Sequence, residues 1–347
     1  MKHLRSVKLL SVLLASLLLA TACGSSPALN EPLANAAETA EGNEVLSLPQ
    51  LAPVETSAAR PLRVVATTSI VGDVVAQVGG EQIVLTTLMG PGQDPHSYEP
   101  STSDLTRVAE ADVIFVNGWD LEEGLVDDLD SIGGDAPLVP VSAGIEPLRS
   151  GAGDAAEEPE QRGEHGIDPH VWLDPQNVLR WAQNIQAALS SLDPANADIF
   201  AANAESYSQE LKALEAIMEE QLGQIPQERR KLVTNHDSLA YFARRFGFEI
   251  VGTVIPAAST VAEPSAQEMV ALVQKMQGEG VCAIFAESTA SAQLAETVAS
   301  ELNNCPGVQV LALYTGALGP EGSGAGSYVE MMRVNTEAIV RGLGNGD

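Results

Sequence analysis

Short apolar runs alternate with amphipathic segments from residue 62 to the end of the chain. In the first half, runs typical of buried strands cover 63–68, 83–88, 112–117 and 137–141. In the second half, the same kind of run covers 231–235, 249–254, 281–286 and 308–313. Helical patterns lie between these runs, and such alternation predicts an α/β protein with a doubly wound parallel sheet in each half. In sheets of this kind, ligands bind beyond the carboxyl ends of the strands.

A longer helical pattern separates the two halves. One helix is expected from Pro175 to Leu192, and a second, longer helix ends near Gly223. Apolar residues of the second helix recur at helical spacing, at Ile199, Tyr207, Leu211, Leu214 and Met218. We therefore predict two similar lobes and one long helix between them. The predicted ranges are 61–192 for the first lobe, 193–226 for the linking helix and 227–347 for the second lobe.

Three histidines lie where the predicted strands and rigid turns end. His96 and His170 each close an Asp-Pro-His unit, and proline stiffens the backbone on both of its sides. His236 follows the apolar run at 231–235. Imidazole is a common protein ligand for zinc and its neighbours in the first transition row. We predict that these three rings converge on one divalent metal ion.

A single histidine is more often an ordinary hydrogen-bonded residue, so the prediction rests on the repeated unit. Without the export signal the chain holds four histidines, and three of them have these settings. The fourth, His165, lies in the acidic, glycine-containing segment 150–166. We interpret His165 as a solvated loop residue rather than as a collector of metal at the site.

The first 22 residues form an export signal. Three basic side chains precede an apolar stretch from Leu9 to Leu19, and small residues lead to Cys23. We expect a lipid on Cys23, as in bacterial lipoproteins, with plain secretion as the alternative. Residues 23–60 are rich in alanine, glutamate, proline and serine and are expected to form a flexible tether.

The net charge and the cysteine content indicate which partners and which covalent link to expect. The formal net charge is −29, and removal of the signal, which has three basic and no acidic residues, takes it to −32. Such an acidic surface repels phosphate backbones, so nucleic acid is not an expected partner. Beyond Cys23 only Cys282 and Cys305 remain, and an even pair in an exported chain favours a disulfide over two buried thiols.

Several motifs resemble those of the solute-binding lipoproteins of zinc and manganese ABC importers, the ZnuA/TroA-like group. They are Asp94-Pro95-His96, Asp168-Pro169-His170-Val171-Trp172-Leu173-Asp174-Pro175, Asn235-His236-Asp237, Phe285-Ala286-Glu287 and Leu313-Tyr314-Thr315. The resemblance implies a rigid backbone helix between two lobes, with the metal in the cleft. It also implies a membrane permease as partner and a monomer held at the outer face of the cytoplasmic membrane or in the periplasm.

The resemblance assigns His96 and His170 to the first lobe and His236 to the second. Members of the group commonly have an aspartate ligand two residues after the tyrosine of the last strand, but this chain has Gly316 there. The fourth ligand is then water, Glu287 or a loop group such as Glu321. Three imidazoles favour zinc, and manganese-directed relatives tend to have a carboxylate where this chain has His236. Manganese is the alternative metal.

Three classes of function remain open from the sequence. The preferred one is a receptor that captures a divalent metal and delivers it to a permease. A zinc-dependent hydrolase with Glu287 as general base is the enzyme alternative, but the chain has no recognisable catalytic motif. A surface adhesin that uses the lipid anchor is a possible secondary role, for which the sequence has no specific signal.

Overall fold

The computed structural model describes residues 45–122, 125–132, 134, 136–149, 151, 166–305 and 307–344. The first lobe contains a parallel sheet with the strand order β2-β1-β3-β4. Its strands are β1 (Leu62–Ala66), β2 (Ile83–Thr87), β3 (Val113–Val116) and β4 (Leu138–Pro140). Its helices are α1 (Ser69–Gly79), α2 (Thr102–Ala109), α3 (Leu125–Ile132) and α4 (Pro175–Leu192).

The second lobe repeats this arrangement with the strand order β6-β5-β7-β8, again all parallel. Its strands are β5 (Lys231–His236), β6 (Glu249–Ile255), β7 (Ala283–Glu287) and β8 (Gln309–Leu313). Its helices are α6 (Ala240–Phe246), α7 (Ala266–Glu279), α8 (Gln293–Ser300) and α9 (Tyr328–Gly344). The predicted fold class, two α/β lobes with parallel sheets, is confirmed.

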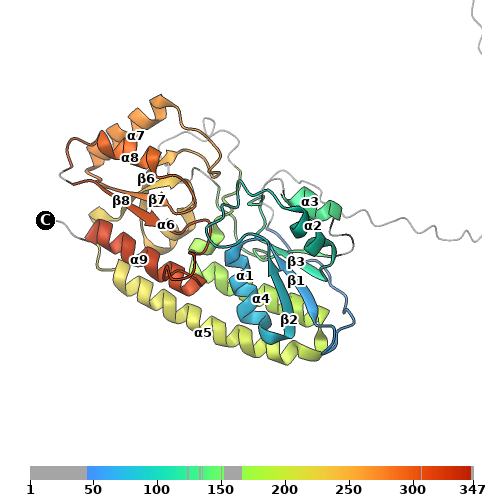
Figure 1. Cartoon of the computed structure of the whole chain (residues 1–347). Helices are drawn as coiled ribbons and strands as arrows, with labels where there is room; N and C mark the ends of the chain where they lie inside the picture. Colours follow the sequence, from blue (N-terminus) through green and yellow to red (C-terminus); the bar gives the residue numbers. More distant parts are fainter. Residues whose placement is uncertain are drawn as a thin grey trace, which may run out of the picture. The chain divides into compact units, whose positions relative to one another are not determined.

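Helices cover both faces of each sheet, which explains why the strands are mainly apolar and do not alternate strictly between apolar and polar residues. In β3, Val113 and Phe115 face one hydrophobic cluster, whereas Ile114 and Val116 face another. Helices α1 and α4 contribute to the first cluster, and α2 and α3 contribute to the second. In the second lobe, α7 and α8 cover the outer face of the sheet (Figure 1).

The long helix between the lobes is α5 (Ala197–Leu222), whose 26 residues extend for about 39 Å. It packs against α1 and α4 of the first lobe and against α9 of the second (Figure 1). One hydrophobic cluster contains residues from both lobes and from α5. The predicted linking helix therefore forms a common packing surface for the two lobes.

The predicted apolar stripe of this helix was wrong at one position. Ile199 is 42% exposed, whereas Phe200 is fully buried. Phe200 lies seven residues before Tyr207, nearly two full turns, and Ile199 lies eight residues before it, which rotates it away by about 80°. The buried stripe is Phe200, Ala204, Tyr207, Leu211, Leu214 and Met218.

The second half of the predicted tether is packed against the first lobe. Leu48, Leu51 and Val54 contact the main hydrophobic cluster, and the Val54 amide donates to Leu192 O at 2.9 Å. Arg60 forms an ion pair with Asp112. The predicted signal, Cys23 and the first half of the tether lie outside the described residues, and so does His165.

Cys282 and Cys305 form a disulfide in the structure, with their Cα atoms 5.6 Å apart. The bridge joins the start of β7 to the segment between α8 and β8, at the amino ends of these strands. Within the described part of the chain, no helix has both the length and the hydropathy that a membrane span requires.

Candidate metal centre

Three buried histidines meet at the carboxyl ends of the two sheets. His96 lies in the loop that follows β2, and its side chain is 7% exposed. His170 precedes a short 3₁₀ turn and the start of α4, and His236 is the last residue of β5. Two of them obey the rule that ligands bind beyond the carboxyl ends of parallel strands, because His96 follows β2 and His236 ends β5. The convergence of all three was predicted from the repeated Asp-Pro-His unit and from the preference of metals for imidazole.

The three rings point their Nε2 atoms at one another. His170 Nε2 lies 3.2 Å from His96 Nε2 and 3.1 Å from His236 Nε2. Ligands at 2.0–2.1 Å from a tetrahedral zinc ion are about 3.3 Å apart, so this spacing is that of donors around one ion. These histidines are the one group of at least three potential ligands found among the described residues.

The orientation of His170 is fixed by Asp168. Asp168 Oδ1 lies 2.8 Å from His170 Nδ1 and also accepts a hydrogen bond from the His170 backbone amide at 2.9 Å. Both side chains are fully buried. A proton on Nδ1 that points to this carboxylate leaves the lone pair of Nε2 free for a metal.

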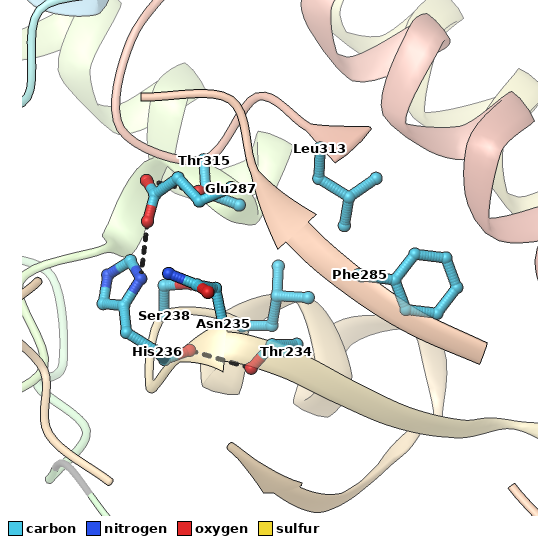
Figure 2. A pocket seen from close by; sticks show the side chains of 9 residues that line it. Thr234, Asn235, His236, Ser238, Phe285, Glu287, Leu313 and Thr315 are labelled. Carbon is cyan, nitrogen blue, oxygen red and sulfur yellow. Dashed lines mark hydrogen bonds and ion pairs between the residues drawn. The ribbon is translucent and has the colours of Figure 1, made fainter. Parts of the chain in front are cut away.

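His236 has a carboxylate in the corresponding place, which Figure 2 shows at the ends of β5 and β7. Glu287 Oε2 lies 2.7 Å from His236 Nδ1, although the contact is not that of a straight hydrogen bond. Thr315 Oγ1 donates to Glu287 Oε1 at 2.6 Å and holds this carboxylate in place. The structure therefore places Glu287 behind His236 rather than among the ligand atoms.

His96 lacks such a partner. Its Nδ1 atom is buried and has no hydrogen-bond partner among the described residues. The turn that carries it is instead ordered through the backbone, because Asp94 Oδ1 accepts from the His96 amide at 3.0 Å. The two Asp-Pro-His units thus hold their histidines in different ways.

The local environment keeps two of the rings neutral. Burial, followed by the nearby rings of His170 and His236, lowers the pKa of His96 to about 3. Burial and then His236 lower the pKa of His170 to about 3. Both rings are therefore unprotonated at neutral pH and can donate a lone pair to a metal.

The pair of His236 and Glu287 behaves differently. Burial lowers the pKa of His236, but the carboxylates of Glu287, Asp94 and Asp168 together raise it by more, so that the net shift is upward. Burial raises the pKa of Glu287, yet His236 and the Thr315 hydroxyl lower it by more, to about 2. Burial raises the pKa of Asp168 to about 7. Metal bound at Nε2 therefore competes with a proton at His236.

Gly316 lies beside this arrangement. A Cβ atom at this position would lie 2.9 Å from Glu287 Oε1 and 3.3 Å from the Cδ atom of Pro95, the residue before His96. The position therefore lies between Glu287 and the turn of His96, and it contributes no ligand atom. Glu321, the other candidate for a fourth ligand, is exposed.

Sequence reasoning identified the histidines but missed the roles of Asp168 and Thr315. Asp168 stood in the same motif as His170, and its spacing of two residues from the ring was the available signal. Thr315 had no signal, because its contact with Glu287 joins residues 28 apart in the sequence.

Comparison with known proteins fits this geometry. The family described as zinc-uptake complex component A, periplasmic (ZnuA) matches residues 64–342, which include all three histidines. The chain belongs to the ZnuA family. This membership agrees with the resemblance and with the two-lobed fold.

Relatives within this family differ in the metal that their names record. The manganese-binding lipoprotein MntA of Halalkalibacterium halodurans is 36% identical over 81% of this chain and 88% of its own length. The iron-binding protein YfeA of Yersinia pestis is 31% identical over 82% of this chain and 88% of its own. The structure of the periplasmic zinc-binding protein TroA from Treponema pallidum has a TM-score of 0.71 and 30% identity, covering 82% of this chain and 99% of that one.

Proposed function

We propose that this protein captures a zinc ion outside the cytoplasmic membrane and delivers it to the permease of an ABC importer. The observation that carries the proposal is the group of three buried imidazole nitrogens, from His96, His170 and His236. Two of these rings are neutral at neutral pH, and a carboxylate lies at Nδ1 of His170 and of His236. The ZnuA family comprises receptors of metal-uptake complexes, so the zinc-hydrolase alternative is not retained.

The ligand chemistry favours zinc. Zinc accepts three imidazoles and one further ligand in a tetrahedral arrangement, whereas manganese prefers more oxygen ligands. In the described part of the chain, the candidate ligand group contains nitrogen atoms alone. The Glu287 carboxylate, which lies behind His236, is engaged by His236 and Thr315.

Manganese is the second candidate cargo. It is favoured by the relative at 36% identity that is named a manganese-binding lipoprotein. Glu287 would have to leave His236 to supply an oxygen ligand, and that move would break its contacts with both His236 and Thr315. Because manganese would need Glu287 to give up these two contacts, we propose zinc as the first candidate.

The delivery role implies a permease as partner, and we further propose a lipid anchor on Cys23. The anchor is supported by the small-residue stretch that ends at Cys23 and by relatives that are named lipoproteins. Mass spectrometry of the membrane fraction tests it, because a Cys23→Ala variant should lose the lipid and appear in the soluble fraction. Unchanged membrane association of that variant would contradict the anchor.

Metal content and competition binding on the purified chain without its signal test the cargo. We expect one zinc per chain and a preference for zinc over manganese. His170→Ala should weaken zinc binding by orders of magnitude because it removes a ligand and leaves Asp168 buried without its partner. His165→Ala is the matched control and should change little. Equal losses in both variants, or a preference for manganese, would contradict the proposal.

A further inference from the structure

A hydrogen bond connects the two lobes next to the metal centre. Thr260 Oγ1 donates to Asp94 Oδ2 at 2.5 Å. Thr260 belongs to the loop that follows β6 in the second lobe, and Asp94 opens the turn that carries His96 in the first. The bond therefore joins the turn of one metal-facing histidine to the opposite lobe.

Asp94 organises that turn from within. Its Oδ1 atom accepts from the His96 amide at 3.0 Å, and its Oδ2 atom accepts from Ser97 Oγ at 3.2 Å. Because His96 Nδ1 has no partner among the described residues, its ring lacks the carboxylate that holds the other two. The position of His96 therefore depends on its backbone turn, and through Asp94 on Thr260.

The same loop of the second lobe also contacts the turn of His236. The amide of Asp237, which follows His236 directly, donates to Ala257 O at 2.9 Å. Ala257 and Thr260 are three residues apart, so one short loop touches the turns of two metal-facing histidines. This loop therefore links the turn of His96 to the turn of His236.

We propose that Thr260 is a positioning residue that holds the His96 turn against the second lobe and slows the release of bound metal. This inference rests on the proposed function, because it presumes that the three histidines bind metal. The hydroxyl touches neither the metal nor a ligand atom; it acts through Asp94. Its effect should therefore appear in the dissociation rate and leave the association rate unchanged.

Stopped-flow transfer of zinc to a chromogenic chelator tests the inference. Thr260→Val keeps the branched shape of the side chain but removes the hydrogen-bond donor. The loss of a hydrogen bond to a charged acceptor corresponds to a change of about tenfold to a hundredfold in the dissociation rate. We expect dissociation to be faster by that factor. Thr260→Ser keeps the hydroxyl and should restore slow release.

Ser97→Ala is the matched control, because it removes a donor to the same Asp94 oxygen without crossing between the lobes. It should change dissociation much less than Thr260→Val. The positioning role would be overturned if zinc dissociates equally fast from Thr260→Val and from wild type, or if Ser97→Ala accelerates dissociation as much as Thr260→Val does. Either result would leave the binding of zinc itself unaffected. A wild-type chain that takes up no zinc would overturn both this inference and the proposed function.

Discussion

Replacing Gly316 by aspartate tests how the centre handles a carboxylate ligand. Gly316 is not among the residues with positive φ, so its backbone accepts an L side chain. The new Cβ would lie 2.9 Å from Glu287 Oε1, so this oxygen must shift away from it. The side chain would then occupy the space between Glu287 and the turn of His96.

The expected magnitude follows from the two neighbouring carboxylates. Unit charges about 4 Å apart at an effective dielectric constant of about 20 repel by about 4 kcal/mol. The metal-free variant should therefore be less stable than wild type, or should bind a proton at this pair. A divalent ion relieves the repulsion, so metal should raise the melting temperature more in Gly316→Asp than in wild type.

Selectivity is the decisive observable. Manganese gains more than zinc from an added oxygen ligand, so Gly316→Asp should raise manganese affinity more than zinc affinity. Competition titrations of both metals measure this, with Gly316→Asn as the control that has the same Cβ contact but no charge. If the zinc-to-manganese ratio is the same in wild type and Gly316→Asp, or if Gly316→Asn shifts it equally, the reasoning about this position is wrong.

Three further predictions concern other parts of the molecule. Glu287→Gln keeps an acceptor near His236 but removes the charge, so zinc affinity by competition should fall about tenfold to a hundredfold; unchanged affinity would contradict the role of this carboxylate. Mass spectrometry of the non-reduced protein should show Cys282 linked to Cys305, and replacing both by serine should lower the free energy of unfolding by roughly 3 kcal/mol; labelling of both as free thiols would contradict the bridge. Glu122 is buried in the first lobe, where its carboxyl accepts from Thr67 Oγ1 and from the Asn117 amide, and burial raises its pKa above the ordinary value of 4.5. Stability should therefore fall as pH rises from 4.5 to this raised pKa. In chemical unfolding of the metal-free protein, Glu122→Gln should reduce the loss of unfolding free energy with pH by up to about 1.4 kcal/mol per pH unit. If the free energy of unfolding changes with pH equally in the variant and in wild type, this prediction is wrong.

The fold was predictable because its signals are local. Each strand of both sheets was recognised as a short apolar run, since parallel sheets covered on both faces need apolar residues throughout. The positions of His96 and His236 followed from topology, because ligands bind beyond the carboxyl ends of parallel strands. The inclusion of His170 rested on the repeated Asp-Pro-His unit. Their binding of metal stays a prediction, as do the domain boundaries.

Contacts between distant residues could not be predicted. The tripeptide Asp-Pro-His occurs twice, yet Asp168 contacts the ring of His170, whereas Asp94 contacts only the backbone of His96 and turns to Thr260. The partner that distinguishes Asp94 comes from the other lobe, whereas the Asp168 side chain is hydrogen-bonded within its own motif. The packing of residues 45–60 was missed for the same reason, because its partners lie far along the chain.

The placement of the two buried carboxylates supports zinc as the proposed cargo. Asp168 and Glu287, when ionised, supply two negative charges that match the charge of a divalent ion. Each acts on the ion through an imidazole ring, because it lies at Nδ1 of His170 or His236. This arrangement makes the ring nitrogens better donors without offering an oxygen to the metal. A site that neutralises the ion through its histidines benefits a metal that prefers nitrogen, and it withholds from manganese the direct oxygen contacts that manganese prefers.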